Sequence, residues 1–144
     1  MDASQQIVQI SIFIENRPGR AADVCALFDS EGINVRGFMI SDTNDYGILR
    51  FVVDQPDKAL DLLTRNGYAA KARTILVARL VDEPGNLSKL LNNIAQAGID
   101  VTYSYSLIST FVAIATNDIE EAYRRGVAVG IEFASIDELL AARL

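Results

Sequence analysis

The stretch ENRPGRAADVCALFDSEGINV at residues 15–35 decides the fold, because its pattern returns as VDEPGNLSKLLNNIAQAGIDV at residues 81–101. The Pro-Gly pair and the Gly-Ile pair keep the same offset of 66 residues (84 − 18 and 98 − 32), with no gap between them. Self-similarity at a fixed offset is typical of duplicated structural units. We therefore predict two modules in tandem, at residues 1–71 and 72–144.

Between the two landmarks, each copy has apolar residues at positions i, i+3, i+4 and i+7. This spacing predicts a helix with one buried stripe, and Gly32 and Gly98 lie just past its end, where a left-handed residue is favoured. The single cysteine, Cys25, lies on the predicted stripe, so we interpret it as a core residue. The stripe residues are Ala21, Val24, Cys25 and Phe28 in the first copy and Leu87, Leu90, Leu91 and Ile94 in the second.

The segments around that helix alternate in polarity and predict strands. Val8, Ile10, Ile12 and Ile14 have period two, which places the even positions against the helix. Two strands joined by a polar turn are expected next. They are residues 34–41 and 46–53 in the first copy, and residues 101–107 and 111–116 in the second, where the turn is shorter.

A second helix and a last strand complete each copy. Pro56 suits the first turn of a helix that stops at Gly67, and its equivalent runs over residues 118–125 and ends at Gly126. Last strands follow at about residues 70–74 and 131–133. Ser135 and Glu138 have the spacing of a capping box, which predicts a terminal helix.

The resulting order, β-α-β-β-α-β, predicts an α+β fold of two ferredoxin-like modules. Each module has an antiparallel four-stranded sheet with two helices on one face. A unit of about 70 residues buries little surface by itself. We therefore expect the modules to pair into a larger shared sheet and the protein to form a homodimer.

Composition and charge exclude several classes of function. Thirteen basic and nineteen acidic residues give a net charge of -6, which disfavours nucleic acid as a partner. The sequence has no long apolar run and no signal-peptide pattern, so we predict a cytoplasmic protein without membrane contact. It has no histidine and one cysteine, so common zinc sites and Ser-His-Asp triads cannot form. No metal or cofactor is predicted, and we expect no enzyme activity.

The strand-to-helix turns are the candidate ligand sites. A helix start offers unpaired backbone N–H groups and partial positive charge, and glycine lets a ligand approach the backbone, so a small carboxylate fits there. The candidate residues are Asn16, Arg17, Pro18, Gly19, Arg20 and Ala21 in the first copy and Asp82, Glu83, Pro84, Gly85, Asn86 and Leu87 in the second.

Asn34 and Asp100 begin the strand after each helix, and we expect the crossover to bring them to face the turn. Asn16 and Asn34 would then accept hydrogen bonds from an amino group, while the helix start holds the carboxylate. Alternatively, Asn16 and Asp82 only cap their helices. The charge difference between the copies predicts that the first turn favours a carboxylate and that Asp82 and Asp100 favour an ammonium group.

The residues Glu15-Asn16-Arg17-Pro18-Gly19, followed by Gly32-Ile33-Asn34-Val35, resemble the ACT domain, notably the regulatory domain of phosphoglycerate dehydrogenase. Asp82-Glu83-Pro84-Gly85 resembles the broader form of the same motif. The resemblance covers nearly the whole chain as two copies and implies amino-acid binding at an interface between modules, with Asn16 and Asn34 as ligand residues. Ile14 stands where the serine-binding domain has histidine, so serine specificity does not follow.

The resemblance implies a non-catalytic, allosteric regulatory sensor that binds a free amino acid. One alternative is a regulatory subunit that docks on an amino-acid biosynthetic enzyme, as the small subunits of acetolactate synthase do. Another is a ligand-free ferredoxin-like interaction module. The sequence identifies neither the amino acid nor the regulated pathway.

Overall fold

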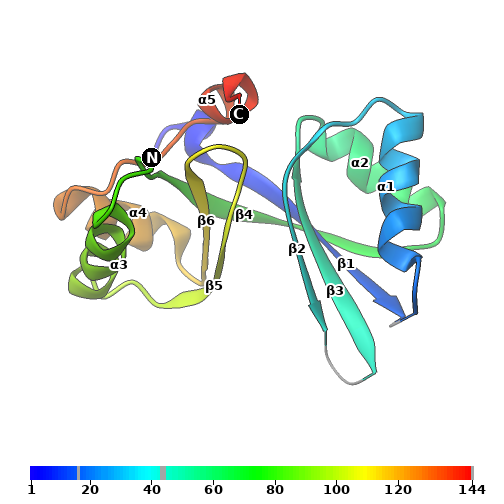
Figure 1. The fold of residues 1–144 in the computed structure, drawn as a ribbon, viewed down its shortest axis with the longest axis horizontal. Helices are drawn as coiled ribbons and strands as arrows, with labels where there is room; N and C mark the ends of the chain where they lie inside the picture. The colour runs from blue at the N-terminus through cyan, green and yellow to red at the C-terminus, as the bar shows by residue number, and fades with distance from the viewer. Residues whose placement is uncertain (16, 43–44, 144) are drawn as a thin grey trace. The chain divides into compact units, whose positions relative to one another are not determined.

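A computed structural model describes residues 1–15, 17–42 and 45–143 of the chain (Figure 1). The chain divides into two compact units. The first module is Val8–Arg73, and the second module is Thr74–Leu144 together with Met1–Ile7. The predicted boundary after residue 71 falls within a strand and stays a prediction. No helix in the described part of the chain combines the length and apolarity needed to cross a membrane.

The first module has the predicted β-α-β-β-α-β order. Its strand order is β2-β3-β1-β4, so β3 separates β1 from β2, and β2 is an edge strand. β1 pairs antiparallel with β3, and β3 pairs antiparallel with β2. The elements are β1 (Ile7–Glu15), α1 (Arg20–Ser30), β2 (Val35–Asp42), β3 (Tyr46–Val53), α2 (Pro56–Arg65) and β4 (Ala69–Arg79), of which the start of β4 belongs to this module.

The core of the first module lies between its strands and the pair of helices α1 and α2, which lie on the same side of β1 to β3 (Figure 1). Ile10 and Ile12 are fully buried in this core, which confirms the predicted parity of β1. Val24 and Phe28 of α1 meet them there. The Phe28 ring packs edge-on against the Phe51 ring at 5.2 Å between centroids.

The second module repeats this order. The end of β4 pairs with β6, and β6 pairs with β5, both antiparallel. The predicted last strand at residues 131–133 is reduced to one bridge between Ala78 and Phe133. The further elements are α3 (Asn86–Gln96), β5 (Val101–Ser106), β6 (Phe111–Thr116), α4 (Ile119–Ala128) and the terminal helix α5 (Ile136–Ala141), preceded near the N-terminus by the short 3-10 helix η1 (Ala3–Gln5).

Only half of each predicted helical stripe is buried. Val24 and Phe28 in α1, and Leu90 and Ile94 in α3, are buried as expected. Cys25 is exposed, which corrects its interpretation as a core residue. Leu87 and Leu91 are also more than half exposed. The helices are rotated so that the i and i+4 positions flank the sheet instead of lying over it.

Gly126 does not end a helix, contrary to the prediction. It is buried inside α4, and Gly130, with a φ of 95°, takes the left-handed place after the helix. A Cβ atom at Gly126 would lie 2.6 Å from the Phe133 ring. The first module has Leu63 and Ala70 at the equivalent places, 63 residues earlier (126 − 63 and 133 − 70). The first module therefore has the large side chain on the helix and the small one on the following strand, and the second module has the reverse.

We expect Gly126→Ala to lower the free energy of unfolding by about 1–3 kcal/mol, because the added methyl group must displace the Phe133 ring in a packed core. Urea denaturation followed by circular dichroism measures this. Val127→Ala is the matched control on the exposed side of the same helix, and we expect a change within about 0.5 kcal/mol. Equal stability of Gly126→Ala and the wild type would contradict this account of the packing.

The terminal helix is fixed by a cap and an ion pair. Ser135 and Glu138 form the predicted capping box, with both hydrogen bonds present. The Arg79 guanidinium, at the end of β4, donates two hydrogen bonds to the Glu138 carboxylate and contacts Glu132 at 3.5 Å. The bonds from Arg79 hold the pKa of the Glu138 carboxyl below its usual value.

A lowered pKa in the folded state stabilises the fold above about pH 4.3, the ordinary value, and this contribution is lost as the pH falls through the lowered pKa. Glu138→Gln keeps the cap but removes the charge. We expect it to cost up to about 1 kcal/mol at pH 7, since the pair is partly exposed. Urea titrations at several pH values should show this difference shrinking below pH 4, with Glu120→Gln as the exposed control. A difference independent of pH would refute the role of the ion pair.

Candidate functional site

The two strand-to-helix corners have the same backbone. In the first, the N–H of Arg17 donates to the carbonyl of Glu15 at 2.8 Å, and in the second Glu83 donates to Val81 at 2.8 Å. The N-cap residue is a left-handed glycine in both, Gly19 with a φ of 88° and Gly85 with a φ of 91°. Only glycine adopts this conformation at little cost, so the Pro-Gly pairs fix where each helix begins.

Both corners present free backbone donors. The N–H groups of Ala21 and Ala22 in α1, and of Leu87 and Ser88 in α3, donate to no carbonyl among the described residues. Among the described residues, neither N-cap glycine provides a side-chain cap and Asp82 makes no hydrogen bond to the start of α3. Asn16 lies outside the described residues. Each corner therefore offers donors and the positive end of a helix to an anion.

The cations of the first corner are already engaged. Arg17 contacts the Glu15 carboxylate at 2.8 Å, with both side chains exposed. The Arg20 guanidinium lies over the Tyr68 ring, 5.6 Å from its centroid, and one of its nitrogens is 3.9 Å from the Asp23 carboxylate. Arg20 is thus held by its own module, and its Nε is buried without a hydrogen-bond partner in the described structure.

The second corner is more acidic than the first. Asp82, Glu83, Pro84 and Gly85 are all exposed. Asn86 stands in place of Arg20, and its side-chain amide donates to the carbonyl of Val81 at 3.0 Å, which closes the turn.

The structure separates Asn34 and Asp100 from the corners of their own modules. The expectation that the crossover brings them to face the turn is wrong, because β3 lies between β1 and β2. Glu15 is level with Tyr46 at one end of β3, and Val35 is level with Val53 at the other. Each first helix has eleven residues and separates the two places by about 16 Å. The predicted residues of one copy therefore cannot hold one small ligand within one module.

Asn34 and Asp100 each lie near polar residues of their own module. The backbone N–H of Asn34 donates to the Asp54 carboxylate at 2.9 Å, and the side chain of Asn34 is exposed. In the second module the carboxylate and the amide are exchanged, as Asp100 and Asn117. These two line a cavity of about 190 Å³ with Arg125, whose guanidinium reaches the carbonyl of Gly98 at 3.4 Å.

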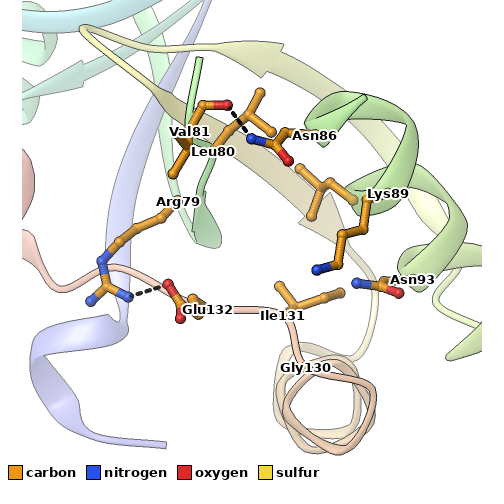
Figure 2. A pocket seen from close by; sticks show the side chains of 10 residues that line it. Arg79, Leu80, Val81, Asn86, Lys89, Asn93, Gly130, Ile131 and Glu132 are labelled. Atoms are coloured by element: carbon orange, nitrogen blue, oxygen red, sulfur yellow. Dashed lines mark hydrogen bonds and ion pairs between the residues drawn. The ribbon is translucent and has the colours of Figure 1, made fainter. Parts of the chain in front are cut away.

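A second cavity, of about 220 Å³, lies beside the second corner, between α3 and residues 130–132 (Figure 2). Asn86 is the one predicted site residue that lines it. Lys89, Asn93 and Glu132 also line it and were missed by the sequence analysis. Asn86, Lys89 and Asn93 follow the spacing i, i+3 and i+7, so they share one side of the helix. The sequence does show this polar row beside the buried apolar row of the same helix. A polar row is also expected on any helix face exposed to solvent, so the pattern alone does not predict a ligand site.

Comparisons with known proteins agree with this architecture. The model of the ACT domain pair matches residues 5–138. A solved structure of a protein from Bacteroides thetaiotaomicron is 27% identical, with a TM-score of 0.87, and the match covers 96% of this chain and 98% of that chain. No curated protein matches the sequence.

The regulatory subunits of aspartate kinase from two Thermus species share the fold. The subunit from Thermus thermophilus, in its ligand-free form, is 20% identical with a TM-score of 0.64, covering 88% of this chain and 93% of that chain. The subunit from Thermus flavus is 20% identical with a TM-score of 0.63, covering 87% and 93%. Together with the family match across both modules, these findings confirm the predicted α+β fold of two ferredoxin-like units, and the chain belongs to the ACT domain pair family.

Proposed function

We propose that this protein is a non-catalytic regulatory sensor that binds a free amino acid between ACT modules. The observation that carries the proposal is the pair of corners with free backbone donors, at the positive ends of α1 and α3. Such donors suit the carboxylate that every free amino acid carries. The names of the Thermus neighbours, which are regulatory subunits, support a regulatory role.

The separation of Asn34 from its own corner supports a site made by two modules. Asn34 immediately precedes the edge strand β2, and the corner lies level with the end of β2, through the pairs Asp42 with Gly47 and Glu15 with Tyr46. If two copies pair their β2 strands antiparallel, the start of one strand lies opposite the end of the other. Asn34 of one copy then comes beside the corner of its partner, where its amide oxygen can accept from the ligand ammonium group.

An apolar groove beside β2 supports this pairing of two copies. Phe38 and Ile40 of β2 are 59% and 57% exposed. They line a cavity of about 400 Å³ together with Ala22 and Cys25 of α1. An exposed apolar edge strand is a template for pairing with another strand, and a groove of this kind marks an interaction surface. We propose that a second copy of the chain covers it and makes a homodimer.

We expect the double variant Phe38→Ser/Ile40→Ser to dissociate the homodimer, with a dimer dissociation constant raised at least about tenfold, because burial of these side chains contributes more than about 1.4 kcal/mol. Sedimentation equilibrium of the full chain measures this. Phe13→Ser is the matched control, since Phe13 is exposed but lies outside the groove. A wild-type protein that stays monomeric at all concentrations would contradict the proposed dimer.

We expect at least one of the twenty amino acids to raise the melting temperature of the full chain, because a ligand that binds only the folded state stabilises it. Asn34→Ala should raise the dissociation constant of that ligand about tenfold in calorimetry, since the variant loses one hydrogen bond to a charged group. Asn92→Ala, on the exposed face of α3, is the control. If no amino acid shifts the melting temperature, a ligand-free interaction module replaces the sensor.

Ligand binding at a shared interface supplies a mechanism of regulation. A ligand that touches two modules binds the docked arrangement more tightly than the separated one, and so shifts the equilibrium toward it by that difference in affinity. Any protein that recognises one arrangement is then regulated by the amino acid. A ligand this small is expected to bind in the micromolar to millimolar range, which suits the sensing of metabolite concentrations.

A further inference from the structure

The cavity of about 220 Å³ in the second module lies at a place where the first module has the side chains of Arg20 and Tyr68 in contact. The two places are equivalent by backbone hydrogen bonds. The N–H of Tyr68 donates to the carbonyl of Leu63 at 3.0 Å, and 63 residues later (131 − 68 and 126 − 63) Ile131 donates to Gly126 at 2.9 Å. The two places therefore share this turn after the second helix, although the strand that follows is full in the first module and reduced to one bridge in the second.

In the first module, large side chains occupy the space. The Arg20 guanidinium lies on the Tyr68 ring and contacts Asp23, and Leu27 and Tyr68 pack against the core. In the second module, three of these four residues are replaced by smaller ones, and Asp23 is replaced by a lysine, which reverses the charge. Arg20, Asp23, Leu27 and Tyr68 correspond to Asn86, Lys89, Asn93 and Ile131.

The replacements bring unused polar groups to the cavity. Figure 2 shows the side chains of Lys89 and Asn93 reaching side by side from α3 toward Ile131. Within the described part of the chain, the Lys89 ammonium group has no carboxylate partner and the Asn93 amide has no hydrogen-bond partner. An ammonium group and an amide donor on adjacent turns of a helix are suited to the two oxygens of one carboxylate.

The remaining walls restrict the class of ligand. Leu80, Leu90 and Ile131 supply apolar surface, and the Glu132 carboxylate, 74% exposed, stands at the rim beside Arg79. The volume corresponds to about seven waters of liquid, which admits a compact metabolite. An aliphatic chain can therefore contact the apolar wall while its carboxylate meets Lys89.

We propose that this cavity of the second module binds a small aliphatic carboxylate, held by Lys89 and Asn93. The site lies within one module and does not depend on the dimer or on the corner of the first module. Its ligand is either an α-amino acid, whose ammonium group can donate a hydrogen bond to the Glu132 carboxylate, or the corresponding carboxylic acid without the amino group. Both share the carboxylate that the cavity recognises.

The test is a titration of the full chain with L-valine and, separately, with 3-methylbutanoate, which lacks only the amino group. Two-dimensional NMR should show saturable shifts of the backbone amides at residues 89, 93 and 131 with at least one probe at millimolar concentration. Shifts with both probes support recognition of the carboxylate alone. Shifts with L-valine only support the site with Glu132 as the ammonium acceptor, and shifts with the acid only support the site without it.

Variants separate this cavity from the corner of the first module. Lys89→Gln should raise the dissociation constant of the probe at least about tenfold, because the variant loses a charge-assisted hydrogen bond. Asn92→Ala, one residue from Asn93 but not in the lining, should bind as the wild type does. Asn86→Arg/Ile131→Tyr rebuilds the side chains that fill the first module and should abolish the shifts. If that double variant fails to fold, the binding of the probe to Lys89→Gln tests the proposal by itself.

The proposal is overturned if neither probe shifts these amides, or if Lys89→Gln binds as tightly as the wild type. Shifts confined to residues 19–23 would also overturn it, while leaving the amino-acid sensor of the first corner intact. Conversely, an amino acid that binds Asn34→Ala as tightly as the wild type would count against the proposed dimer-interface site, while the shifts at residues 89, 93 and 131 would be unaffected. The two proposals therefore fail independently.

Discussion

The sharp turn from the first strand into the first helix is the constraint on which each module depends. The chain must reverse direction within a few residues, and it does so through a left-handed glycine that starts the helix, Gly19 or Gly85. Glycine has no side chain with which to cap the helix, and among the described residues the second and third N–H groups of α1 and α3 donate to no carbonyl. The same geometry that makes the fold possible therefore creates a place for an anion.

Duplication allowed the two modules to diverge by exchange of complementary residues. Leu63 with Ala70 in one module becomes Gly126 with Phe133 in the other, so the core stays filled. The pair Arg20 with Tyr68 becomes Asn86 with Ile131, and here the volume is not replaced. A packed interior does not tolerate an empty space without cost. A space that persists at the polar edge of a module is consistent with occupation by water or by a ligand.

The topology separates the two groups of residues that the proposed amino-acid site requires. The corner and the start of β2 lie at opposite ends of the module, because an eleven-residue helix joins them. Each end carries half of the chemistry that an amino acid requires: backbone donors for the carboxylate and a side-chain oxygen for the ammonium group. Antiparallel association of edge strands brings unlike ends together. The proposed regulation by association of modules would use this separation.

The sequence by itself determined the features that depend on local rules. The repeat, the strand parity of Ile10 and Ile12, the helix starts after Pro-Gly and the capping box at Ser135 and Glu138 all follow from the conformational preferences of a few neighbouring residues. Only the tertiary structure decided which half of each apolar stripe is covered, that Gly126 packs against Phe133, and that Asn34 lies far from its own corner. Periodicity states that a helix has an apolar face, but the direction of that face and the order of strands depend on contacts between residues distant in the chain.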